Sequence, residues 1–132
     1  MKVLLTGSSG YIGRRLKQKL LQDENIELRL LVRNKKSVSE DLDKKVQVFE
    51  GDTFNVDSLK DALKDVDVAY YLIHSLSSEN YKNLDRISAA NFVNIANECN
   101  VKKIIYLGGL GVKNENTSEH LLSRIETGEV LS

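Results

Sequence analysis

A run of glycines near the amino terminus has the spacing of a phosphate-binding loop. The segment Thr6–Gly13 reads TGSSGYIG, with a glycine at every third position. Gly7 would permit a tight turn out of a strand, Gly10 would let the backbone approach a phosphate, and Gly13 would let a helix pack closely on the sheet. The amino terminus of that helix would offer unpaired N–H groups and a partial positive charge to the anion. The alternative is a turn that merely favours glycine.

A basic residue further along the chain bears on which anion is bound. In dinucleotide-binding folds, an acid at the end of the second strand binds the ribose 2′-hydroxyl of NAD, whereas a base favours the 2′-phosphate of NADP. Arg33 stands twenty residues after Gly13, and its guanidinium fork suits a phosphate dianion. Further positive charge comes from Arg14, Lys35 and Lys36. NADP is therefore favoured over NAD, unless Arg33 is simply a solvated charge that ends a strand.

The elements that must position these residues alternate between short apolar runs and amphipathic stretches. Buried strands are expected at Lys2–Thr6, Glu27–Arg33, Val46–Glu50, Val66–Ile73 and Lys103–Leu107. Helical periodicity predicts helices at Tyr11–Gln22, Asp57–Lys64, Asn80–Asn100 and Thr117–Leu131. The apolar positions that recur at helical steps include Ile12, Leu16, Leu20, Leu59, Ala62, Leu63, Leu84 and Ile87. Strands joined by crossover helices predict one α/β domain over residues 1–132, a three-layer, Rossmann-like, doubly wound parallel sheet with about five strands.

Composition excludes several classes of protein. The 132 residues carry 19 Lys+Arg and 19 Asp+Glu, and a balanced charge does not suggest a nucleic-acid binder. A single cysteine, Cys99, excludes a disulfide framework, and it is expected to be a small buried hydrophobe. With two histidines and no acidic cluster, no metal site is expected. No apolar run approaches the ~18 residues that span a membrane, so we expect a cytoplasmic chain without membrane partners.

The TGxxGxxG loop after the first strand resembles that of the short-chain dehydrogenase/reductase superfamily, in its atypical and extended branches. The segment KIIYLGGLG at residues 103–111 is similar to the fifth strand of NmrA-like and NAD-dependent epimerase/dehydratase-like proteins. Gly51-Asp52 after the third strand is similar to the site of the adenine-contacting acid of that family, although Asp52 could also be a plain turn residue. The resemblance covers essentially the whole chain and implies NAD(P) binding.

The cofactor-binding residues expected on this basis gather at the ends of strands. They are Gly7, Ser8, Ser9, Gly10, Tyr11, Ile12, Gly13, Arg14, Arg33, Asp52, Thr53, Ile73, His74, Ser75 and Gly108. His74 and Ser75 follow the fourth strand, at the carboxyl edge where ligands of open α/β sheets bind. They could border the ribose and nicotinamide, or His74 could be a satisfied polar residue at a strand end.

The catalytic residues that the resemblance implies are not found. Members of the superfamily use a serine after the fifth strand and a Tyr-x-x-x-Lys pair, in which the tyrosine exchanges a proton with the substrate. Here Gly108-Gly109 replaces the serine, and no tyrosine is followed four residues later by a lysine. His120 and Arg124 have the same spacing on the last expected helix. They could donate a proton and bind ribose or phosphate, or they could be polar residues of an exposed face.

Two functions stay open. One is an NAD(P)-dependent oxidoreductase or epimerase-like enzyme acting on a small carbonyl, sugar or quinone, and we expect this one. The other is a non-catalytic NADP-binding redox sensor, regulator or assembly factor, which the missing catalytic set supports. The resemblance is to proteins about twice as long, so we expect the chain to be the amino-terminal part of a longer protein. A part of the site would then be absent, and the chain alone could bind nothing.

Overall fold

A computed structural model describes residues 1–34, 46–72 and 81–106, and of residues 81–85 it describes the backbone only. The elements are β1 (Lys2–Thr6), α1 (Tyr11–Leu21), β2 (Glu27–Val32), β3 (Gln47–Glu50), α2 (Val56–Leu63), β4 (Val68–Tyr71), α3 (Tyr81–Glu98) and β5 (Lys103–Tyr106). They agree with the predicted elements within one or two residues at each described end. The predicted helix Thr117–Leu131 lies outside the described residues.

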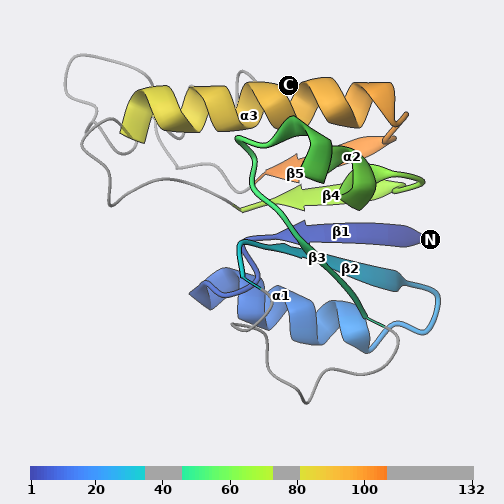
Figure 1. Cartoon of the computed structure of the whole chain (residues 1–132). Helices are drawn as coiled ribbons and strands as arrows, with labels where there is room; N and C mark the ends of the chain where they lie inside the picture. The colour runs from blue at the N-terminus through green and yellow to red at the C-terminus, as the bar shows by residue number, and fades with distance from the viewer. Residues whose placement is uncertain (35–45, 73–80, 107–132) are drawn as a thin grey trace, which may run out of the picture.

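The described strands form one parallel sheet of five strands in the order β3-β2-β1-β4-β5. At the centre, Leu5 of β1 is in register with Leu30 of β2 and Tyr70 of β4. The chain first adds strands on one side of β1 and then crosses to the other, with α1 on one face and α2 and α3 on the opposite face (Figure 1). This confirms the predicted three-layer, doubly wound fold. In such sheets, ligands bind outside the carboxyl ends of the strands where the order reverses, here beside β1.

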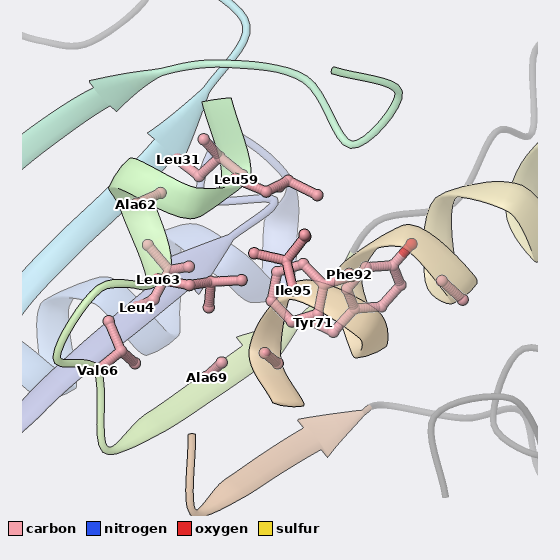
Figure 2. Packing of buried hydrophobic residues seen from close by; sticks show 12 residues of the cluster. Leu4, Leu31, Leu59, Ala62, Leu63, Val66, Ala69, Tyr71, Phe92 and Ile95 are labelled. Carbon is pink, nitrogen blue, oxygen red and sulfur yellow. The ribbon is translucent and has the colours of Figure 1, made fainter. Parts of the chain in front are cut away.

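The larger core lies between the sheet and the helices α2 and α3 (Figure 2). All three predicted apolar residues of α2, namely Leu59, Ala62 and Leu63, are fully buried there. Phe92 of α3 lies against Tyr71 of β4, with ring centroids 5.0 Å apart in a tilted arrangement. Tilted aromatic pairs of this kind contribute about 0.5–1.5 kcal/mol beyond the area they bury.

Two helical positions that were expected to be apolar contacts are exposed. Ile87 of α3 is 49% exposed, and its neighbour Ser88 is buried instead, followed at helical steps by Phe92 and Ile95. Ile12 of α1 is 46% exposed. In α3 the buried face is rotated by about one residue from the stripe expected from the sequence, because that face includes a polar residue, Ser88, which hydrophobic periodicity does not count. In α1 only Ile12 departs from the expected stripe, since Leu20 is buried and Leu16 packs against the same core.

A smaller core fills the space between α1 and the other face of the sheet. Leu5 and Leu30 are fully buried there, and Leu20 of α1 is 7% exposed. The same strands send Leu4 and Leu31 to the α2–α3 side. Both faces of the strands are therefore apolar, as a parallel sheet covered on both sides requires.

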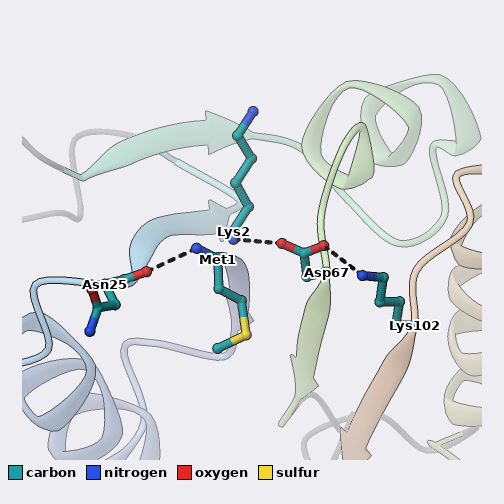
Figure 3. Close-up of polar contacts among 5 residues, drawn as sticks. All are labelled: Met1, Lys2, Asn25, Asp67 and Lys102. Atoms are coloured by element: carbon teal, nitrogen blue, oxygen red, sulfur yellow. Dashed lines mark hydrogen bonds and ion pairs between the residues drawn. The ribbon is translucent and has the colours of Figure 1, made fainter.

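The amino edge of the sheet is closed by polar contacts of ordinary residues (Figure 3). The terminal ammonium of Met1 donates to the carbonyl of Asn25 at 2.9 Å, and the Lys2 N–H donates to Asp67 Oδ2 at 3.0 Å. Lys102 forms an ion pair with the same carboxylate, with 3.9 Å between Lys102 Nζ and Asp67 Oδ1. The Asp67 N–H also donates to the Lys2 carbonyl, and the Asp67 carbonyl accepts the Lys102 N–H, so that Asp67 joins β1, β4 and β5 where they begin. Within the described ranges, no helix is both long and apolar enough to cross a membrane.

Candidate functional site

The carboxyl edge of the sheet carries the glycine loop, whose first and third glycines are required by the fold itself. Gly7 has φ of +74°, and a Cβ at this position would approach the Leu72 carbonyl oxygen to 2.9 Å. This confirms the expected tight turn after β1. A Cβ on Gly13 would overlap the Gly7 carbonyl oxygen. Gly13 thus allows close packing, as predicted, but its nearest neighbour is the glycine loop and not the sheet.

The middle glycine differs from the other two. Gly10 precedes α1 with φ of −75°, a value that any residue adopts. Among the described residues, a Cβ here would meet only the Gly7 carbonyl oxygen, at an ordinary contact distance of 3.6 Å. The packing of the described residues therefore does not require glycine at this position. The absence of a side chain instead leaves the backbone at Gly10 open to the approach of a ligand.

The start of α1 is arranged as an anion site. No side chain caps the helix at Gly10, and the first turn contains no acidic residue. Such a helix start has N–H groups without intrahelical partners and a partial positive charge. A phosphate is the group that this arrangement favours, because it accepts several N–H groups and carries negative charge.

A pocket of about 470 Å³ opens at this edge. Its walls come from three segments far apart in sequence, and Leu72 after β4 completes them. The lining residues are Gly7, Ser8, Ser9, Gly10, Leu31, Val32, Arg33, Asn34, Gly51, Asp52, Thr53 and Leu72. The volume falls within the range of roughly 300–1,000 Å³ typical of small-molecule and cofactor sites. The fold thus brings the glycine loop, Arg33 and the Asp52–Thr53 segment around one cavity.

The Asp52–Thr53 segment forms a tight turn in the wall of the pocket. Asp52 Oδ1 accepts the Phe54 N–H at 3.0 Å, and the Asp52 N–H donates to Ser58 Oγ at 3.0 Å. A Cβ on Gly51 would come within 2.7 Å of the Ser58 side chain. Asp52 is therefore a turn residue and a pocket residue at once. Its adenine contact stays a prediction.

Thr53 is held by α3 and not only by its own loop. Ser88 Oγ donates to Thr53 Oγ1 at 2.7 Å, and Asn91 Nδ2 donates to the Thr53 carbonyl at 2.8 Å. The sequence analysis missed Ser88, Asn91 and also Leu72, which closes the pocket. The three-residue spacing of Ser88 and Asn91 on a helix was a signal that they share a face, but nothing in the sequence told which loop they would meet.

Other residues predicted to bind the cofactor lie outside the lining of the pocket or outside the described residues. Tyr11, Ile12 and Arg14 are exposed in the first turn of α1 and do not line the pocket. The guanidinium of Arg15 lies 4.3 Å from the centre of the Tyr11 ring. The cofactor contacts expected of Tyr11, Ile12 and Arg14 stay predictions. The remaining predicted site residues lie outside the described residues, namely Ile73, His74, Ser75, Gly108, His120 and Arg124.

The one cysteine lies away from the pocket. Cys99 is half-buried against the core between the sheet and α3. Burial raises the pKa of its thiol, and the nearby carboxylates of Glu98 and Asp65 raise it further. Because only the thiolate is a strong nucleophile, Cys99 is a packing residue at neutral pH, in line with its expected role.

Comparison with known families gives one match over most of the chain. The profile of a family described as NAD(P)H-binding matches residues 7–130. A search of curated proteins finds no significant match.

Solved structures with the same fold are numerous, and three show the range. A nucleoside-diphosphate-sugar epimerase from Staphylococcus aureus has a TM-score of 0.85 and 24% identity over 99% of this chain and 46% of its own. The NADP(H) complex of a Citrobacter triphenylmethane reductase has a TM-score of 0.81 and 24% identity, over 99% and 45%. The NADPH complex of an Escherichia coli quinone oxidoreductase has a TM-score of 0.78 and 22% identity, over 98% and 44%. The chain spans less than half the length of each.

Proposed function

The chain belongs to the NAD(P)H-binding family, and from this premise we propose that its pocket holds NADP in preference to NAD. The observation that carries the proposal is the joining of three segments around one cavity of about 470 Å³: an uncapped helix start, Arg33, and the Asp52–Thr53 turn. Each suits a different part of a dinucleotide. In this arrangement the backbone N–H groups from Gly7 to the start of α1 bind the pyrophosphate, and Asp52 accepts a hydrogen bond from adenine.

Arg33 carries the preference between the two cofactors. It is exposed and lines the pocket beside Asn34, at the end of β2 where dinucleotide folds read the adenosine ribose. A guanidinium binds a 2′-phosphate with two parallel hydrogen bonds, which a ribose hydroxyl cannot match. Two of the similar structures hold NADP(H) or NADPH, which supports the same choice.

Beyond cofactor binding, the proposed activity is that of an oxidoreductase or epimerase-like enzyme of the atypical short-chain dehydrogenase/reductase type, in the cytoplasm. The bound nicotinamide would supply hydride transfer, and His120 and Arg124 are the proposed proton donor and ribose- or phosphate-binding residue. The substrate classes are those expected from the sequence: a small carbonyl, a sugar or a quinone. The names of the similar sugar epimerase and quinone oxidoreductase fall in two of these classes, whereas the triphenylmethane reductase is named for a dye outside them.

A second function is favoured by one feature of the sequence. Gly108-Gly109 stands where the superfamily has its catalytic serine, and no Tyr-x-x-x-Lys pair is present. A chain that keeps the cofactor residues and lacks this set fits a non-catalytic NADP-binding sensor, regulator or assembly factor of the NmrA-like type. Turnover of NADPH with a panel of quinones, aldehydes and nucleotide sugars supports the enzyme, whereas saturable binding without turnover supports the sensor.

The cofactor preference is tested by reversing the charge of Arg33. We expect Arg33→Asp to weaken NADPH binding at least tenfold and NADH binding less than threefold, both measured by calorimetry, since a charged hydrogen bond contributes about 1.5–3 kcal/mol. Lys19→Asp, an exposed lysine near the far end of α1, is the matched control and should change neither. An equal loss for both cofactors would overturn the assignment of Arg33.

A further inference from the structure

Three buried hydroxyl groups lie in a row beneath one wall of the pocket. Tyr71 of β4, Ser88 of α3 and Thr53 are 0%, 1% and 3% exposed. Tyr71 Oη and Ser88 Oγ are 2.5 Å apart, and Ser88 Oγ donates to Thr53 Oγ1 at 2.7 Å. Because the single hydroxyl hydrogen of Ser88 is used in the bond to Thr53, Tyr71 donates to Ser88. The row therefore runs from the carboxyl end of β4 to the pocket wall.

The backbone of the same turn is held as well. Asn91 stands three residues after Ser88 on α3 and donates from Nδ2 to the Thr53 carbonyl at 2.8 Å. From the other side, Ser58 Oγ accepts the Asp52 N–H at 3.0 Å. The Ser58 hydroxyl hydrogen faces the carbonyl oxygens of Asn55 at 2.7 Å and Asp52 at 3.1 Å. The Asp52–Thr53 turn is thus fixed by side chains from α2 and α3, and through Ser88 by β4.

A network of buried hydroxyl groups is unusual at a position that adjoins an apolar core. It adjoins the apolar core, where the Tyr71 ring packs on Phe92 at 5.0 Å and lies 6.1 Å from the Tyr106 ring. Apolar residues would fill that space without the cost of removing hydroxyl groups from water. Buried polar groups that are fully paired instead define one arrangement, and the arrangement defined here is that of a pocket wall.

We propose that Tyr71, Ser88 and Asn91 are positioning residues that act through Thr53 to hold the adenosine edge of the pocket. The inference rests on the proposed dinucleotide function, because the edge in question is the one that Asp52 and Thr53 form. None of the three lines the pocket. Their effect on binding is therefore indirect and falls on the adenosine half of the ligand.

The test removes one hydroxyl group while keeping the shape of the side chain. Thr53→Val loses the bond to Ser88. We expect Thr53→Val and Ser88→Ala to weaken the binding of 2′,5′-ADP about five- to tenfold, the loss that one net hydrogen bond of about 1 kcal/mol and some loop disorder produce. Tyr70→Phe removes a hydroxyl group outside the row and the pocket, and its affinity for 2′,5′-ADP should stay within twofold. Reduced nicotinamide mononucleotide is the second probe, and its affinity should not change in any variant.

A second measurement needs no ligand. The Phe54 and Asn55 N–H groups bond to Asp52 within the turn, and the Lys2 and Asp67 N–H groups bond at the opposite edge of the sheet. In Thr53→Val, amide hydrogen exchange should accelerate at Phe54 and Asn55 only. Tyr70→Phe, a half-buried tyrosine of the same strand, is the control and should leave all four unchanged.

Three results overturn the proposal. Equal losses for both mononucleotide probes would mean general destabilisation, and an unchanged 2′,5′-ADP affinity would mean that the network does not position the wall. If the unaltered chain binds neither NADPH nor 2′,5′-ADP, the proposed function fails and the network positions nothing for a nucleotide. In that case, exchange at Phe54 and Asn55 still shows whether the hydroxyl groups order the turn.

Discussion

The two edges of the sheet end the same strands in opposite ways. At the amino edge, the ammonium of Met1 and the side chains of Asp67 and Lys102 satisfy the neighbouring groups. The turns that lead into β4 and β5 at this edge contain non-glycine residues with positive φ, namely Asp65 and Asn100. At the carboxyl edge, two glycines are required by close contacts, and the helix start beyond them has no capping side chain. One edge is completed by the protein itself. The other leaves polar groups and space that a ligand completes.

The largest loss of stability and of cofactor binding is expected at Gly13, where the carboxyl edge has no room for a side chain. A Cβ in Gly13→Ala would overlap the Gly7 carbonyl oxygen, so either the loop or α1 must move. We expect a loss of unfolding free energy of about 3 kcal/mol, the upper end of what overpacking costs, together with loss of NADPH binding. Urea denaturation measures the first and calorimetry the second. A stable Gly13→Ala protein with unchanged affinity would contradict the packing described for this loop.

A smaller effect, confined to stability, is expected at the amino edge. Asp67→Ala removes the acceptor of the Lys2 N–H and should lower the unfolding free energy by about 1–2 kcal/mol. This is below the range of about 1.5–3 kcal/mol for a hydrogen bond to a charged group, because the Asp67 side chain is partly exposed to solvent. Lys102→Ala should cost less than about 0.5 kcal/mol, because exposed ion pairs contribute little and this lysine side chain is 80% exposed. Neither variant should change the affinity for NADPH. A change in affinity without unfolding would mean that the two edges are coupled.

The same contrast explains what could be predicted from the sequence. The glycine loop, Arg33 and the strand ends are local signals, and their meeting at one edge follows from the rule that parallel strands end together. The buried faces of α1 and α3 were predicted incorrectly at Ile12 and Ile87, since the true faces include Gly13 and Ser88. The bond between Ser88 and Thr53 joins residues 35 apart, and no periodicity indicates such a contact.

Gly10 tests the central claim most directly, because the packing of residues 1–34, 46–72 and 81–106 does not require a glycine at this position. Gly10→Ala places a Cβ only 3.6 Å from the Gly7 carbonyl oxygen, an ordinary contact, at a backbone conformation that alanine accepts. The unfolding free energy should stay within about 0.5 kcal/mol of the unaltered chain. Calorimetry with NADPH should show at least a tenfold loss of affinity, since the methyl group takes the space into which the pyrophosphate must come. An unchanged NADPH affinity in a folded Gly10→Ala protein would contradict the placing of the dinucleotide at this loop.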